Sequence, residues 1–277
     1  MIIQTTEPDQ PHFAIEQRDH ARMCGSLALA FAQVVYQTPM PEGLFVFTVA
    51  HHDEGWVVID ERVEQSPVTG LPYHLTQTPL PYLLQTSKGS PDFNEERHAY
   101  CGLLSSMHTV GLFNGRYGLS DFVFIDRVPA GHKADVEALL AAELARQARL
   151  RHLLEINPAT KAWVEQDALF TNYKLLQFFD TLALYFHLTH GERRKEGHFL
   201  NVPTGRGLDK TVTITPQEDG TYCLIPWCFP GDSLEVWVEG RYMTQHPAGT
   251  NLKPIFEATA KVKQIYRLVA GRGRLWA

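Results

Sequence analysis

Apolar residues recur at helical spacing in five stretches of the chain, and each stretch predicts a helix. Pro39 and Pro41 end the first stretch, because proline removes a hydrogen-bond donor and disfavours helix in the residue before it. The fourth stretch is rich in Ala, Leu, Glu and Arg, which favour helices. The predicted helices cover residues 13–36, 42–53, 95–113, 133–155 and 161–190.

After Gly197 the apolar and polar residues alternate instead, as they do in strands, and turn sequences separate the alternating segments. Predicted strands cover residues 211–215, 221–225, 234–238 and 264–269, and a short helix is expected near 256–262. The sequence therefore predicts a mainly α fold, a helical bundle with a small C-terminal antiparallel β region, which is α+β overall. We expect a helical domain at 1–197 and a small β-rich subdomain at 198–277 packed on it.

Two segments lack a regular pattern. Residues 1–11 are polar, contain Pro8 and Pro11, and are expected to form a loose arm. Residues 57–94 contain so many prolines and glycines that we predict no long regular element there. Because this segment directly follows a polar stretch around His52 and Asp53, it is either a lid over a site or a purely structural excursion.

Composition narrows the possible partners. The 277 residues carry a formal net charge of -6, which argues against nucleic acid as the main partner, because phosphate binding needs clustered Lys and Arg. The N-terminus lacks the features of a signal peptide, and no apolar run is long enough to span a membrane. We therefore expect a cytoplasmic protein with a small-molecule substrate. The sequence is compatible with a monomer or a homo-oligomer. The four cysteines are expected to be reduced and mostly buried.

Five polar residues stand out because they interrupt apolar helical patterns: His20, His52, Asp53, His108 and Asp180. A carboxylate such as Asp180 is costly to bury unless it is paired or binds a cation. The adjacent His52 and Asp53 can turn one nitrogen and one oxygen toward a single ion, a ligand set that suits Fe, Mn, Zn or Ni better than Ca. A polar helix end without metal is the alternative for this pair alone.

The order of these residues resembles the HD superfamily of metal-dependent phosphohydrolases, in which helices of a bundle converge on one or two divalent ions. The resemblance implies an HD-like fold for the helical domain. It also implies that His20 is the first ligand, that His52 and Asp53 are the signature pair, that His108 is the additional histidine of two-metal members, and that Asp180 is the last ligand.

Several segments are similar to those of a narrower, uncharacterised bacterial family related to HD proteins, and they are spread over most of the chain. They are residues 17–20, 52–56, 69–73, 104–108, 176–180 and 226–229. One departure concerns Trp56, which stands where many HD phosphohydrolases have a lysine after the signature pair. Arg18, Arg22, Arg62 and Arg116 are candidates to replace that cation near a substrate phosphate.

Helical geometry separates the remaining histidines. His98 and His108 are ten residues apart, about 15 Å on a continuous helix, so both cannot belong to one cluster, and we assign His108. His51 points about 100° away from His52 on a helix, which favours packing or a role behind the ligands. His187 follows Asp180 by two helical turns, which allows a place at the outer rim of the site, but we expect a surface position.

Three functions follow as hypotheses. The first is a hydrolase of a phosphate ester or nucleotide-like small molecule, in which the metal activates a water and Asp53 and His108 take part in catalysis. Ser105 and Gln177, each one turn from a ligand, and Trp56 would then line the substrate pocket with Arg22 and Arg116. The second is a di-iron oxygenase, which a minority of HD-fold proteins resemble, and the third is a non-enzymatic metal- or ligand-binding protein.

Overall fold

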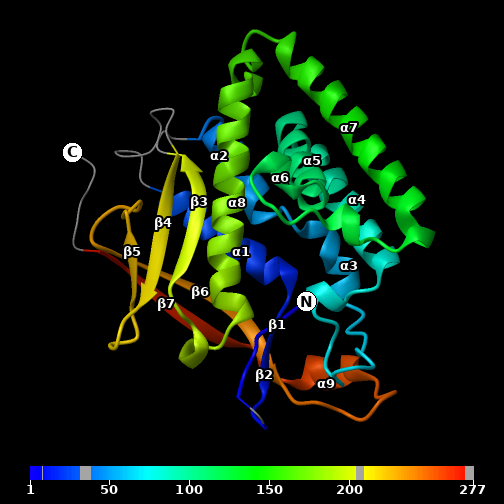
Figure 1. The fold of residues 1–277 in the computed structure, drawn as a ribbon, viewed down its shortest axis with the longest axis vertical. Coiled ribbons are helices and arrows are strands. Elements are labelled where there is room, and N and C mark those ends of the chain that lie inside the picture. Colours follow the sequence, from blue (N-terminus) through cyan, green and yellow to red (C-terminus); the bar gives the residue numbers. More distant parts are fainter. Residues whose placement is uncertain (8, 32–38, 204–208, 272–277) are drawn as a thin grey trace.

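A mixed sheet forms one side of the molecule, and helices cover one of its faces (Figure 1). The computed structural model describes residues 1–7, 9–31, 39–203 and 209–271. Within these residues the sheet has seven strands in the order β1-β2-β6-β7-β5-β4-β3, and only the β5–β7 pair is parallel. The strands are β1 Ile2–Ile3, β2 His12–Ile15, β3 Gly197–Pro203, β4 Asp209–Pro216, β5 Tyr222–Ile225, β6 Ser233–Met243 and β7 Val262–Ala270.

The helices pack in layers behind the sheet. Helices α1 and α8 lie against β6 and β3, α2 packs on both of them, α5 packs on α8 and α2, and α4 and α7 pack on the outer side of α5. The main helices are α1 Gln17–Ala30, α2 Glu42–Ala50, α4 Leu80–Arg97, α5 Ala99–Phe113, α7 Lys133–Glu155 and α8 Gln166–Leu188. Shorter helices are α3 Val57–Asp60, α6 Gly115–Gly118 and α9 Leu252–Ala258, and 3-10 turns are η1 Glu54–Trp56, η2 Leu75–Gln77, η3 Phe124–Arg127, η4 Ala130–His132, η5 Lys161–Val164 and η6 Gly191–Arg193.

The predicted fold class, mainly α with a small C-terminal antiparallel β region, is wrong. The sheet is mixed, and its strands β1 and β2 come from the N-terminus, where a loose arm and the start of a helix were expected. The physical reason is that these strands, of two and four residues, are held by pairing that no local pattern shows, β1 with β2 and β2 with the distant β6. Whether the chain forms two domains divided at residue 197 stays a prediction.

Some of the predicted helices agree with the structure and others do not. The predicted helices at 42–53, 133–155 and 161–190 contain α2, α7 and α8, while the first begins at Gln17 and its predicted end at 36 falls outside the described residues. The prediction of no long element in 57–94 is wrong, because α4 runs through Pro91. Pro81 lies in the first turn of α4, where proline fits a helix. A lid function for this segment stays a prediction.

Close packing of α1 on α2 depends on Gly25. A Cβ atom on Gly25 would lie 2.5 Å from the Cβ of Ala50, well inside van der Waals contact. Ala50 is the last residue of α2, directly before the turn with His52 and Asp53. The absent side chain therefore lets α1, which carries His20, come close to that turn.

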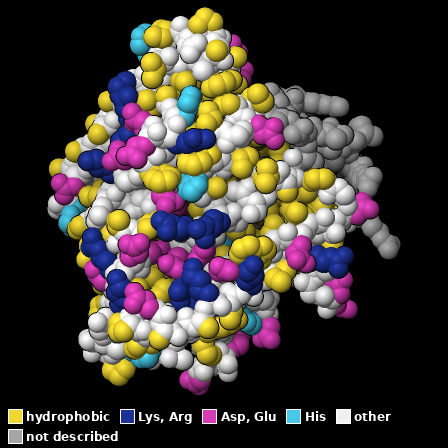
Figure 2. Space-filling model, turned by 180° about the vertical axis from the view of Figure 1, so that it is seen from behind, with side chains coloured by type: hydrophobic (Ala, Val, Ile, Leu, Met, Phe, Trp, Pro, Cys, Tyr) yellow, Lys and Arg dark blue, Asp and Glu magenta, His cyan; other side chains and the backbone are white. Residues whose placement is uncertain are grey.

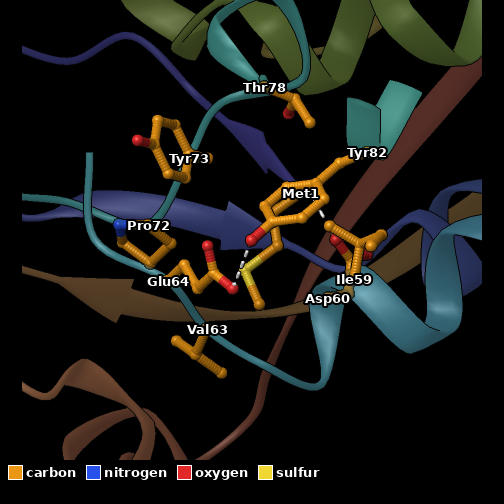
Figure 3. A pocket seen from close by; sticks show the side chains of 9 residues that line it. All are labelled: Met1, Ile59, Asp60, Val63, Glu64, Pro72, Tyr73, Thr78 and Tyr82. Atoms are coloured by element: carbon orange, nitrogen blue, oxygen red, sulfur yellow. Dashed lines mark hydrogen bonds and ion pairs between the residues drawn. The ribbon is translucent and has the colours of Figure 1, made fainter. Parts of the chain in front are cut away.

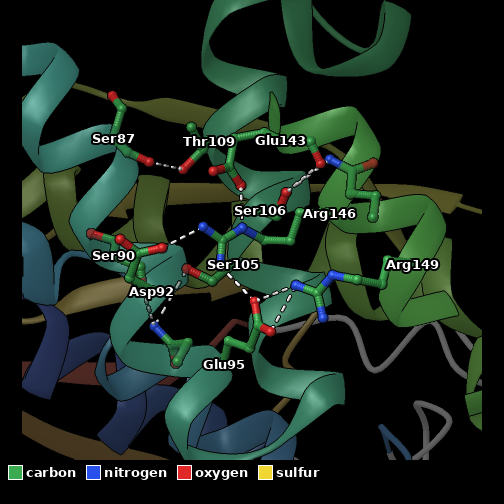
Figure 4. A network of polar contacts seen from close by, with 12 residues as sticks. Ser87, Ser90, Asp92, Glu95, Ser105, Ser106, Thr109, Glu143, Arg146 and Arg149 are labelled. Carbon is green, nitrogen blue, oxygen red and sulfur yellow. Dashed lines mark hydrogen bonds and ion pairs between the residues drawn. The ribbon is translucent and has the colours of Figure 1, made fainter. Parts of the chain in front are cut away.

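A polar network braces α5 against α4 and α7 (Figure 4). The Arg146 guanidinium pairs with Asp92, Glu95 and the buried Glu143. The Ser106 hydroxyl donates to the Glu143 carbonyl oxygen, so the network reaches the middle of α5. It therefore fixes the helix that carries His108.

The surface mixes charges of both signs, as the face in Figure 2 shows, with acidic and basic side chains interspersed. No helix among the described residues is long and apolar enough to cross a membrane. The four cysteines are free, as expected, and three of them are buried.

Candidate metal centre

Four elements bring the five polar residues together in the interior. His20 comes from α1, His52 and Asp53 from the turn after α2, His108 from α5 and Asp180 from α8. The Oδ1 atom of Asp180 lies 3.2 Å from His20 Nε2 and 3.9 Å from His52 Nε2, and Asp53 Oδ2 lies 3.4 Å from His52 Nε2. The His52 and His108 rings meet edge to face with centroids 5.0 Å apart.

The protons on His20 can be assigned from its neighbours. Met23 Sδ, which accepts hydrogen bonds, lies 3.2 Å from His187 Nε2, so that nitrogen carries the proton. Burial, and then the charge of His20, lowers the pKa of His187 well below its ordinary value, so His187 is neutral and its Nδ1 accepts. The partner at 2.9 Å is His20 Nδ1, which must donate. This bond leaves His20 Nε2 as the atom that faces Asp180.

His52 is oriented in the same way. Its Nδ1 donates to the Val49 carbonyl oxygen at 2.8 Å, because a carbonyl can only accept. Its Nε2 is buried without a hydrogen-bond partner among the described residues, and it faces the carboxylates of Asp53 and Asp180. A second ring nitrogen therefore points at carboxylate oxygens.

Nitrogen lone pairs that face carboxylate oxygens repel each other unless a positive charge lies between them. That charge is a proton on each ring or a metal cation. Donor atoms about 2.1 Å from an ion, at tetrahedral or octahedral angles, lie about 3.0 to 3.4 Å from each other. The contacts of 3.2 and 3.4 Å match this spacing. The donor set therefore fits a divalent transition metal.

His108 is held by Gln177 of α8, whose Nε2 lies 2.7 Å from His108 Nδ1. In this orientation the amide donates to the ring, and Gln177 Oε1 is buried without a partner among the described residues. The opposite orientation of the amide has the same shape and lets Oε1 accept the Nδ1 proton. His108 Nε2 is then free to bind a metal, and the amide oxygen is satisfied.

The histidines of the site differ in the direction in which their surroundings shift the pKa. Burial lowers the pKa of His52, but the charges of Asp53 and Asp180 outweigh burial and raise its pKa above the ordinary value. Burial, and then the charge of His52, lowers the pKa of His108 to about 4. Burial alone would raise the pKa of Asp180, yet its contact with His20 and the charge of His52 bring it well below the ordinary value. Without metal, positive charge therefore gathers on His52, and His108 stays neutral.

Sequence reasoning missed three residues around this cluster. His187, expected at the surface, is fully buried against His20. Cys24 Sγ lies 3.7 Å from His20 Nε2 one helical turn away, and burial, then the charges of Asp180 and Asp53, raise the pKa of the thiol well above its ordinary value. The spacing of seven residues from Asp180 to His187, and of four from His20 to Cys24, placed each pair on one helix face.

Asn94 is the third missed residue, and no local pattern marks it. Its Nδ2 donates to the His51 carbonyl oxygen at 2.9 Å and to Ser105 Oγ at 3.3 Å. It therefore ties α4 and α5 to the turn with His52 and Asp53. The His51 side chain faces away from the cluster, as expected, and its Nδ1 contacts Glu54 at 2.9 Å.

The predicted substrate residues are dispersed. Trp56 is buried in η1, and Ser105 is fully buried in the contact with Asn94. Arg22 is mostly exposed and pairs with Asp19. Gln177 and Arg116 line one pocket of about 670 Å³ between α8, β3 and the segment after α5. The roles of all predicted site residues stay predictions.

A second cavity, which Met1, Asp60 and Tyr82 help to line, is too small for a substrate (Figure 3). Its volume is about 20 Å³, about the size that one water molecule needs. The amino group of Met1 forms a buried ion pair with Asp60 there at 2.6 Å, and Tyr82 donates to Glu64. The ion pair holds Met1 against α3, which carries Asp60.

A family model described as "Protein of unknown function (DUF3891)" matches residues 1–245. No curated protein and no solved structure matches the chain.

Proposed function

We propose that this chain, which belongs to the DUF3891 family of proteins of unknown function, is a metal-dependent hydrolase of phosphate esters. The observation that carries the proposal is the set of imidazole nitrogens and carboxylate oxygens that face one another without a donor between them. The order of these residues along the chain, which resembles that of HD phosphohydrolases, supports the same conclusion. A cytoplasmic location and a small-molecule substrate belong to this proposal.

The residues take distinct roles in it. His20, His52, Asp53 and Asp180 would hold the metal, and His108 would complete the site or hold a second ion. When bound, the metal supplies a Lewis acid that activates water near neutral pH. His187 and the Val49 carbonyl orient the rings of His20 and His52 through their Nδ1 protons.

Asp53 is placed to handle the water. Its side chain is 15% exposed, while the rings of His20 and His52 are almost completely buried, so it forms the solvent side of the cluster. A carboxylate oxygen there accepts a hydrogen bond from an incoming water and directs its lone pair toward the substrate. The Asn94 bond to the His51 carbonyl fixes the turn that carries Asp53.

Metal content and turnover, measured on the same preparation, test the proposal. Protein purified without chelator is expected to contain at least one transition metal ion per chain and to hydrolyse members of a phosphomonoester and nucleotide panel in the presence of Mn²⁺. Asp180→Asn is expected to lose both the metal and the activity. Asp135→Asn, an exposed carboxylate on α7, is the matched control and is expected to keep both.

Other outcomes would replace the proposal. Stoichiometric iron together with an oxygen-dependent reaction would identify an oxygenase instead. Bound metal without turnover on any substrate of the panel would favour a binding protein. Wild-type protein that purifies without metal would refute the metal centre itself. So would an Asp180→Asn variant that keeps the metal content of the wild type.

A further inference from the structure

The pocket beside Gln177 is large enough for a small molecule. Its volume of about 670 Å³ lies within the range of 300 to 1,000 Å³ that is typical of ligand sites. Lys174, Gln177 and Phe178 of α8 form one wall, and α6 with the residues after it, up to Phe122, and the strand β3 form the others. The pocket therefore lies at the junction of the helical layer and the sheet.

Gln177 connects this pocket to the candidate metal centre. Its side chain lines the pocket, and its amide lies 2.7 Å from His108 Nδ1. Arg116, on another wall, is close enough for its charge to contribute to lowering the pKa of His108, after burial and the charge of His52. A ligand in the pocket would thus lie on the far side of His108 from the buried carboxylates.

Arg116 differs from Lys174, the other lysine or arginine among the described residues that line the pocket. Lys174 pairs with Asp209 at 2.7 Å, and Arg18, Arg146 and Arg241 elsewhere each pair with a carboxylate. Arg116 is half-buried, and in the part of the chain that the structure describes it has no ion-pair partner. The acid that lines this pocket, Asp121, is exposed at the rim. A half-buried guanidinium without a carboxylate is suited to bind an anion.

The backbone is strained on two sides of the pocket. Arg116 and Tyr117 both have φ of 55°, and Asn201 of β3 has φ of 58°, in the left-handed region that side chains disfavour. Asn201 lies in an irregularity of the β3–β4 pairing between Phe199 and Val202. Strained residues and bulges are frequent where a backbone shapes a binding site. Here Arg116 and Asn201 line the same pocket.

The other walls are apolar and aromatic. Phe178 and Phe199 are buried, and Phe122 and Leu200 are exposed toward the rim. Such walls bind flat apolar groups well. We propose that this pocket binds the non-reacting end of the substrate, and that this end is an anionic group, phosphate or carboxylate, attached to a flat apolar body. Its assignment to the substrate rests on the function proposed above.

Binding of small aromatic anions to the full chain, kept metal-free with a chelator, tests the pocket without the metal centre. The probes are phenyl phosphate, benzoate and uncharged benzyl alcohol, measured by isothermal titration calorimetry. At least one anion is expected to bind at least about 10-fold more tightly than the alcohol, and Arg116→Gln is expected to weaken it at least about 10-fold. The stronger of the two anions identifies phosphate or carboxylate as the preferred group.

Matched variants keep the result interpretable. Arg116→Lys retains the charge but not the forked geometry and is expected to bind with intermediate affinity, so it answers the question even where Arg116→Gln is unstable. Arg193→Gln removes a half-exposed cation outside the pocket and should bind like the wild type. Binding of neither anion, or equal affinity in wild type and Arg116→Gln, overturns the pocket. Anion binding that depends on Arg116 in a protein without metal or turnover keeps the pocket and removes only its link to hydrolysis.

Discussion

Replacing His187 by leucine isolates the hydrogen bond that orients His20. Leucine has a similar volume and keeps the buried apolar contacts, but it offers no acceptor for the His20 Nδ1 proton. His20 would then carry a buried N–H without a partner, and its ring could turn or move the proton to Nε2, the atom that faces Asp180. Either change reduces the affinity of the cluster for metal.

Two independent magnitudes agree on the size of this effect. Leaving one buried donor without a partner costs about 1 to 3 kcal/mol. Removing the group that orients a metal-bound histidine typically reduces metal affinity about 10- to 100-fold, which corresponds to about 1.4 to 2.7 kcal/mol. We therefore expect His187→Leu to bind metal about 10- to 100-fold more weakly than the wild type.

Competition with a chromophoric chelator measures this affinity directly. His187→Gln restores an acceptor and is expected to recover most of the affinity, which a purely structural role for the ring would not explain. His152→Leu, an exposed histidine on α7, is the control for removing any imidazole. If the affinity of His187→Leu lies within about twofold of the wild type while its fold is intact, the assignment of protons through Met23, His187 and His20 is wrong.

Three further predictions concern packing and pH. Gly25→Ala forces a methyl group against Ala50 and is expected to lower the free energy of unfolding in urea by about 1 to 3 kcal/mol, and an unchanged midpoint would contradict the close approach of α1 and α2. Tyr173→Phe removes a buried hydroxyl without a partner among the described residues, so unfolding should show unchanged or higher stability, and a loss above about 1 kcal/mol would mean that the hydroxyl is bonded. Burial, and then the positive N-terminus, lowers the pKa of His74 to about 4, so the unfolded chain takes up this proton first and stability falls between about pH 6.5 and 4. His74→Gln keeps an acceptor for the Ile3 N–H and should flatten that fall by about 1 to 3 kcal/mol between pH 7 and pH 4, whereas parallel curves would refute the shift.

The convergence of the polar residues could be anticipated because each of them breaks a local rule. A charged or ionisable residue such as Asp180 in an apolar helix has to find a partner, and the helix face on which it lies is visible in the sequence. His187 lies on the same face as Asp180, yet it was expected at the surface because one histidine near a helix end is not unusual by itself. Its partner His20 is on a distant helix, so no local spacing reveals the contact.

The sheet could be anticipated only in part. The segments of β4, β5, β6 and β7 were recognised from their alternation and the turn sequences between them, whereas β3, with seven residues, was not predicted, and β1 and β2 owe their conformation to hydrogen bonds with other strands. The helix α4 was missed for the opposite reason, since prolines were taken as breaks although tertiary packing on α5 and η1 holds it through Pro91. The local pattern thus indicated the unusual polar residues of the candidate metal centre, but not all of the strands and helices that position them.

The pairing of β2 with β6 also sets the order in which a newly made chain can mature. More than two hundred residues separate the two strands, and at about 5 to 20 residues per second a ribosome needs roughly 10 to 40 s to add them. During that time β2 can pair only with β1, its other edge with Phe13 has no partner strand, and α1, which follows β2 directly and packs on β6, lacks its support. The nascent chain therefore exposes an apolar edge next to His20 until β6 has emerged. A chain whose synthesis stops before β6 is expected to be a substrate for chaperones and proteases.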